Sequence, residues 1–98
     1  MAKLSVVILN YNGRHHLERF LGSVVANTSG DAEVVIADNH STDDSLVWLR
    51  LNYPELRVIA LDRNYGFAGG YNRALSEVDS RYVLLLNSDV EVTAGWWQ

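Results

Sequence analysis

The sequence predicts an α/β fold, an open parallel sheet in βαβαβαβ order with helices on both faces. Three observations indicate this. Four short runs of apolar, largely β-branched residues are typical of buried strands. Three segments between them carry apolar residues at helical spacing. Because strands that alternate with helices pair in parallel through right-handed crossovers, the helices are expected to cover both faces of the sheet.

The first half of the chain contains two predicted strands, at residues 4–9 and 33–37. The helix between them is indicated by apolar residues at i, i+3, i+4, i+7 and i+8, namely Leu17, Phe20, Leu21, Val24 and Val25. After the second strand, Ser41 or Thr42 is expected to cap a helix that runs to about Leu51. Asp43 and Asp44 would then lie in its first turn, where carboxylates suit the helix dipole.

The second half contains a predicted strand at residues 57–61 and another at 82–86. The helix between them is marked by Phe67, Tyr71, Ala74, Leu75 and Val78. No polar residue interrupts the last strand, so it is expected to be buried on both faces.

Composition bounds the classes of function. The 98 residues are 48% hydrophobic, which is enough for one domain with a core, and the net charge of −4 disfavours nonspecific nucleic-acid binding. Without cysteine there is no disulfide, thiol nucleophile or zinc–thiolate site, and the cytoplasm is the expected compartment. The apolar run near the amino end is far shorter than the roughly 20 residues of a membrane span. Trp96 and Trp97 are expected to pack against further core residues or, if exposed, to favour self-association. The single domain at 1–98 is therefore predicted to be truncated at its carboxyl end.

Polar residues follow every predicted strand. Because ligands bind beyond the carboxyl ends of the strands in open parallel sheets, a shared ligand site is expected at that edge. The polar residues at the four strand exits are Asn10 and Asn12, Asp38 and Asn39, Asp62, Arg63 and Asn64, and Asn87 and Asp89.

The last exit carries oxygen ligands of the kind that metals use. If the backbone stays extended, Asn87, Asp89 and Glu91 lie on one side of it. Hard divalent cations prefer such oxygens. The alternative interpretation is an ordinary turn after a strand.

The known sequence motifs for nucleotide binding exclude two classes, P-loop hydrolases and nicotinamide-dinucleotide folds. The chain has no G-x-x-x-x-G-K-[ST], and Gly66, Gly69 and Gly70 do not fit G-x-G-x-x-G. These glycines either let a diphosphate approach the backbone or serve a tight turn and close packing. A phosphoacceptor signalling domain is the alternative from another class, although the first loop offers Asn10 and Asn12 where that class needs acids.

Four motifs, in order and spacing, carry a resemblance that covers nearly the whole chain. They are LSVVILNYNG at 4–13, VVIADNHSTDDS at 34–45, RNYGFAGGYN at 63–72 and LLLNSDVE at 84–91. Together they resemble the amino-terminal half of family 2 glycosyltransferases, particularly bacterial rhamnosyltransferase-like members. The resemblance implies a GT-A fold whose first, Rossmann-like half binds a nucleoside-diphospho-sugar.

The resemblance also implies roles for individual residues. The loop from Asn10 to Asn12 would line the nucleoside pocket, with Tyr11 packing on the base or ribose. Asp38 would recognise the pyrimidine, and Arg63 and Asn64 would contact the nucleotide. Ser41 and Asp43 are weaker candidates for the site, because helix capping explains them equally well. At the family's D-x-D motif stand Asn87, Ser88 and Asp89. Asp89 would contact Mg²⁺ or Mn²⁺, whereas Asn87 replaces the first acid and would bond the ribose.

The reaction that the resemblance implies is the inverting transfer of a sugar from a UDP- or dTDP-sugar to a saccharide or lipid-linked acceptor, in cell-wall or polysaccharide biosynthesis. A peripheral position at the inner face of the membrane is an option for such an enzyme. His15, His16 and His40 are typical of surface residues, and the resemblance implies that the catalytic base lies outside this chain. The 98 residues alone are expected to bind nucleotide weakly and to turn over nothing. A catalytically silent nucleotide-binding module is the remaining alternative.

Overall fold

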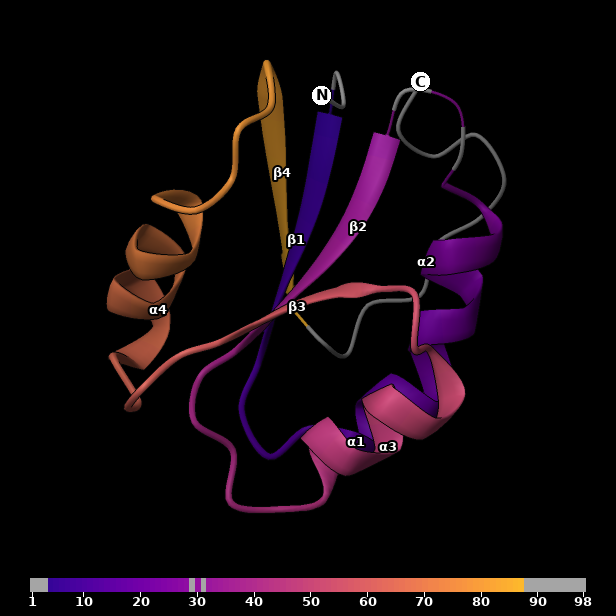
Figure 1. Ribbon diagram of the computed structural model, residues 1–98, viewed down its shortest axis with the longest axis vertical. Helices are drawn as coiled ribbons and strands as arrows, with labels where there is room; N and C mark the ends of the chain where they lie inside the picture. The colour runs from indigo at the N-terminus through magenta and orange to yellow at the C-terminus, as the bar shows by residue number, and fades with distance from the viewer. Residues whose placement is uncertain (1–3, 29, 31, 88–98) are drawn as a thin grey trace.

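The computed structural model describes residues 4–28, 30 and 32–87, which form a four-stranded parallel sheet with helices on both faces (Figure 1). The strands are β1 (Leu4–Asn10), β2 (Ala32–Asp38), β3 (Arg57–Ala60) and β4 (Tyr82–Asn87), in the spatial order β3-β2-β1-β4. The helical elements are α1 (Arg14–His16), the π-helical turn η1 (Leu17–Leu21), α2 (Gly22–Ala26), α3 (Ser45–Asn52) and α4 (Gly66–Leu75). The predicted α/β fold and its order of elements are confirmed.

Each face of the sheet packs against its own set of helices. Figure 1 shows α4 on one side and α1, α2 and α3 on the other. Alternate residues of a strand point to opposite faces, so β1 and β2 each contribute to two cores. The larger core contains Val6, Ile8, Leu17, Leu21, Val24, Val34, Ile36 and Leu49. The core under α4 contains Val7, Val35, Ala37, Ile59, Leu61, Tyr71 and Ala74.

The start of α3 differs from the sequence prediction. Ser41 and Thr42 do not cap this helix: its N-cap is Asp44, and its first turn holds no acid. The reason is that the Ser41 hydroxyl bonds Asp38 and the Thr42 backbone bonds Asn12. Residues 41–44 are therefore held as a loop against the end of β1, and the helix begins only at Ser45.

Strand β4 also differs from its prediction. It lies at the edge of the sheet, paired with β1, and its Tyr82, Val83 and Leu85 side chains are 55%, 38% and 42% exposed. The expectation of burial on both faces is wrong. An apolar run predicts that a strand forms, but it does not determine whether that strand lies at the centre or at the edge of the sheet. The hydroxyl of Tyr71 on α4 donates a hydrogen bond to the Leu86 carbonyl oxygen, which ties this helix to β4.

Within residues 4–28, 30 and 32–87, none of the helices combines the length and the apolar character that crossing a membrane requires.

Candidate functional site

The carboxyl ends of the strands meet at one edge of the sheet. Asn10 at the end of β1 is in register with Asp38 at the end of β2, and Asp38 is in register with Ala60 at the end of β3. On the other side of β1, Leu9 pairs with Asn87. The expected convergence of the strand exits is thus confirmed for the described backbone (Figure 1).

Asp38 is the centre of this edge and is completely buried. Its Oδ1 accepts hydrogen bonds from Asn10 Nδ2 at 2.9 Å and from the Ser41 hydroxyl at 2.7 Å. Its Oδ2 accepts a third from the Ser41 backbone N–H at 2.9 Å. Because a carboxylate offers about four lone-pair positions, these bonds leave it about one further acceptor position.

Asn10 is buried beside this carboxylate, and its Oδ1 has no hydrogen-bond partner among the described residues. Turning the amide over would place Oδ1 against Asp38 Oδ1, so the acidic neighbour fixes the orientation observed. A buried acceptor without a donor costs about 1–3 kcal/mol. The end of β1 therefore presents an acceptor that an N–H or O–H group of a ligand would satisfy.

Asn12 joins the loop after β1 to the loop after β2. It has a left-handed backbone, with φ of 50°, and its Oδ1 accepts hydrogen bonds from the N–H groups of Thr42 at 2.7 Å and Asp43 at 3.1 Å. Its own N–H donates to the Ser41 hydroxyl at 2.9 Å. The amide of Asn12, predicted to line the nucleoside pocket, is thus engaged in holding these two loops together.

Asp43 lies between the amino ends of two helices. Its Oδ2 accepts from the Arg14 N–H at 3.2 Å and its Oδ1 from the Ser45 N–H at 2.9 Å. Partial burial by itself would raise the pKa of Asp43, but the hydrogen bonds from Ser45 and Arg14 outweigh it and hold the pKa below its usual value. A carboxylate at this position also complements the positive ends of α1 and α3.

The loop from β3 to α4 carries Arg63 and Asn64. The guanidinium of Arg63 lies 5.5 Å from the centre of the Tyr65 ring, and that of Arg73 on α4 lies 5.0 Å from it. The Tyr65 hydroxyl donates to Asp62, and this bond, aided by the charges of the two arginines, lowers the pKa of Asp62. Asn64 Oδ1 accepts from the Gly66 N–H at 2.7 Å, which turns the loop into the helix.

The sequence placed Asn39 among the strand-exit residues of the expected ligand site but gave it no individual role. It is 2% exposed and its amide bonds the backbone of Tyr65 and Gly66, so it connects the end of β2 to the start of α4. The signal available in the sequence was the glycine pair at 69–70, because Gly70 leaves room for the Asn39 side chain.

Several predicted site residues remain untested. Tyr11 is 47% exposed in the loop after β1, so its ring is accessible. For Asn87 only the backbone is described, and Ser88, Asp89 and Glu91 lie outside the described residues, as do Trp96 and Trp97. Within the described part, no three His, Cys, Asp or Glu side chains gather as metal ligands would. The assignment of a metal to Asp89 therefore stays a prediction.

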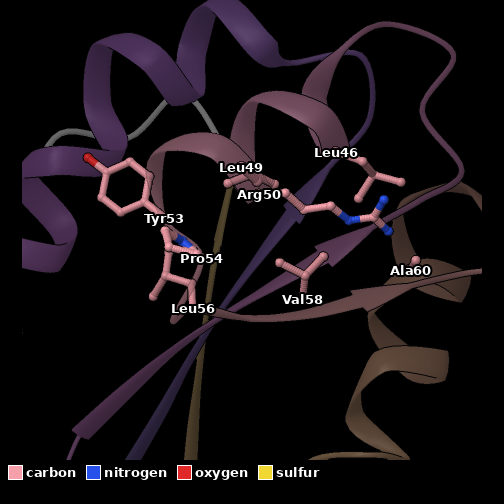
Figure 2. Close-up of a pocket in the computed structure, with 8 residues that line it drawn as sticks. All are labelled: Leu46, Leu49, Arg50, Tyr53, Pro54, Leu56, Val58 and Ala60. Atoms are coloured by element: carbon pink, nitrogen blue, oxygen red, sulfur yellow. The ribbon is translucent and has the colours of Figure 1, made fainter.

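A hollow of about 250 Å³ lies between α3 and β3 (Figure 2). Its lining is mainly apolar, with Arg50 as its charged residue. None of the residues predicted to bind nucleotide lines it, so we do not assign it to the site. Its lining residues are Leu46, Leu49, Arg50, Tyr53, Pro54, Leu56, Val58 and Ala60.

The chain is similar in sequence to known glycosyltransferases, both to a family model and to individual proteins. The family model described as glycosyl transferase family 2 matches residues 5–98. The chain is 30% identical over 103 residues to N-acetylglucosaminyl-diphospho-decaprenol L-rhamnosyltransferase of Mycobacterium tuberculosis, covering 94% of this chain and 34% of that protein. It is 34% identical over 92 residues to the UDP-Glc:alpha-D-GlcNAc-diphosphoundecaprenol beta-1,3-glucosyltransferase WfaP of Escherichia coli, covering 91% and 36%. The chain thus spans about a third of the length of these relatives.

Solved structures agree in fold. S. aureus TarS 1–349 in complex with UDP-GlcNAc matches with a TM-score of 0.77 and 30% identity, over 93% of this chain and 28% of that one. The mannosyltransferase PcManGT from Pyrobaculum calidifontis, in complex with GDP-Man and Mn²⁺, has a TM-score of 0.77 at 23% identity, over 91% and 28%. The second likeness supports the fold alone.

Proposed function

Because this chain belongs to glycosyl transferase family 2, we propose that it forms the donor-binding part of an inverting glycosyltransferase that uses a UDP- or dTDP-sugar. TarS, a structural neighbour, is known in complex with UDP and with UDP-GlcNAc. Family membership removes the phosphoacceptor signalling domain that the sequence had left open. The names of the rhamnosyltransferase and glucosyltransferase relatives support a diphosphate-linked lipid as the class of acceptor.

The observation that carries the proposal is the buried pair of Asn10 and Asp38 at the strand ends. Asp38 has about one acceptor position left, and Asn10 Oδ1 lacks a partner among the described residues. A pyrimidine ring N–H would satisfy such an acceptor, and a base without that donor would leave it unpaired and be rejected. Since both residues are fully buried, the loops that Asn12 joins would have to part for a base to reach them.

The chemistry at the diphosphate rests on Asn87, Ser88 and Asp89. These residues offer oxygen atoms, the donor type that Mg²⁺ and Mn²⁺ prefer, so Asp89 is the proposed ligand of a divalent cation, with Asn87 two positions before it in the sequence. When bound, such a cation neutralises charge that builds on the departing diphosphate. Arg63 and Asn64 would contact the nucleotide from the β3–α4 loop. The base that takes the proton of the acceptor hydroxyl is expected to lie beyond these 98 residues.

Nucleotide titration tests the proposal. Calorimetric titration of the full-length protein with UDP and with dTDP, with and without Mn²⁺, should show metal-dependent affinity for one or both nucleotides. Asp89→Ala should weaken that affinity by about tenfold or more, since it removes a charged metal ligand. Asp79→Asn, which removes the carboxylate of an exposed residue, is the matched control. Absence of binding in the unmodified protein, or affinity indifferent to the metal, would overturn the proposal.

A sugar-transfer assay separates the enzyme from a silent nucleotide-binding module. The full-length protein, supplied with nucleotide sugars and a diphosphate-linked lipid acceptor, should release UDP or dTDP together with a glycosylated lipid. Nucleotide binding without transfer for every donor and acceptor tried would favour the silent module.

A further inference from the structure

Asn39 is a buried polar residue that bonds two separate segments at the edge of the sheet, the end of β1 and the junction of the β3–α4 loop with α4. Its backbone N–H donates to the Asn10 carbonyl oxygen at 2.8 Å, which joins it to the end of β1. Its side-chain Oδ1 accepts from the Tyr65 N–H at 2.9 Å, and its Nδ2 donates to the Gly66 carbonyl oxygen at 2.9 Å. The residue immediately before it is Asp38, whose carboxylate is held by Asn10 and Ser41.

The two side-chain bonds require an amide. One partner is a donor and the other an acceptor, and the Asn side chain presents both kinds of atom on one planar group. The close approach of α4 fixes the length of the side chain, because a Cβ at Gly70 would lie 2.8 Å from Asn39 Nδ2. Asparagine at 39 and glycine at 70 thus form a fitted pair.

We propose that Asn39 is a positioning residue, whose amide fixes the β3–α4 loop and the start of α4 relative to Asp38. That loop carries Arg63 and Asn64, which are predicted to contact the nucleotide, so Asn39 would set the distance between the base-recognising and the nucleotide-contacting parts of the site. The ligand part of this inference rests on the proposed function; the structural part does not.

The substitution Asn39→Asp tests the role of the amide at nearly constant size. At neutral pH the new carboxylate can accept from the Tyr65 N–H but faces the Gly66 carbonyl oxygen without a proton to donate. We expect faster hydrogen exchange at the Tyr65 and Gly66 amides, and UDP affinity in the presence of Mn²⁺ weakened by about tenfold or more. Amides in the centres of β1 and β2 should keep their protection. Asn72→Asp, at an exposed position on α4, is the matched control.

A pH series distinguishes positioning from a general loss of structure. Burial and the neighbouring Asp38 should raise the pKa of the introduced carboxyl, and once protonated it can donate to the Gly66 carbonyl oxygen again. The affinity ratio of N39D to N72D should therefore rise as the pH falls from about 8 to about 6. The ionisable groups on the bridged segments are present in both variants, so the comparison of N39D with N72D isolates the carboxyl at 39 together with its effect on its neighbours; these groups are Asp38, His40, Asp62, Arg63, Tyr65, Tyr71 and Arg73.

The outcomes are separable. If the unmodified protein binds UDP but N39D binds it equally well, the positioning role is wrong and the proposed function stands. If N39D loses affinity without recovery at lower pH, or loses exchange protection throughout β1 and β2, Asn39 merely stabilises the fold. If the unmodified protein binds no UDP, the proposed function and the ligand part of the inference both fail, and the exchange at Tyr65 still decides whether Asn39 holds the loop.

Discussion

Asn10 Nδ2 donates a 2.9 Å hydrogen bond to Asp38 Oδ1, and both residues are closed to solvent at the ends of neighbouring strands. The two strands are in register at this pair, so the bond continues the ladder of the sheet into the side chains. A carboxylate in this position is an acceptor only, whereas an amide there would present a donor as well. The choice of aspartate at 38 therefore determines which groups can lie around it.

Asp38→Asn should destabilise the protein by about 1–3 kcal/mol. Both oxygens of Asp38 accept hydrogen bonds, so in either orientation the new NH₂ group would face a donor of Asn10 or Ser41. Urea unfolding of the variant beside Asp79→Asn measures the difference in the free energy of unfolding. UDP affinity should fall as well, since the acceptor for the ring N–H is altered. Equal stability of D38N and D79N would show that the bonds to Asp38 carry little of the fold.

Asn12 permits a comparison between its backbone and its side chain. Both Asn12→Ala and Asn12→Gly remove the bonds to Thr42 and Asp43, but only glycine adopts the φ of 50° without steric cost. We expect N12A to be less stable than N12G by about 1 kcal/mol. Thermal unfolding of the two variants under identical conditions provides the measurement. A reversed order would mean that the left-handed backbone is not kept.

The depressed pKa of Asp43 makes its contribution to stability dependent on pH. Its folded-state pKa lies below that of the unfolded chain, so the contribution is present above the unfolded value of about 3.9 and is lost as the pH falls through the folded value. Unfolding of the unmodified protein and of Asp43→Asn should therefore differ at neutral pH and converge below about pH 4. A gap between the two proteins that stays constant through this range would contradict the prediction.

Replacing two different glycines with alanine should change the stability of the protein in opposite directions. At Gly70 an added Cβ meets Asn39 Nδ2 at 2.8 Å and Leu9 Cδ1 at 2.9 Å, so Gly70→Ala should overpack the site at a cost of about 1–3 kcal/mol. At Gly22, exposed in the helical segment, the nearest atom is the Tyr53 hydroxyl oxygen at 3.4 Å. Gly22→Ala should stabilise the helix by about 0.5–1 kcal/mol. Denaturant midpoints of the pair test both signs in one experiment.

Local pattern was sufficient for the elements of the fold. The apolar runs at β1 and β2 and the helical spacing from Leu17 to Val25 predicted strands and a helical segment there, because periodicity acts within a few residues; the π-helical turn at Leu17–Leu21 was not predicted. The convergence of polar residues at one edge also followed, since parallel strands carry their carboxyl ends together. Burial of β4 was mispredicted because its neighbours in the sheet are not encoded within the strand itself.

The candidate site was predicted as a set of residues and not as an arrangement. Asp38 and Asn10 were expected at the edge, but the cap assigned to Ser41 and Thr42 was wrong, because both residues bond across to the end of β1 and the loop after it. Asn39 was expected at the edge without an individual role, since its partners Tyr65 and Gly66 lie far along the chain, at the start of α4.

The sequence by itself determined the types and order of the elements, the edge at which polar groups collect and the family to which the chain belongs. Only the tertiary structure decided which of those groups act on each other. Asn12 and Thr42 are 30 residues apart in the chain, and Asn39 and Tyr65 are 26 apart. Hydrogen bonds at such separations leave no periodic trace in the sequence, because they form only after the sheet has brought the loops together.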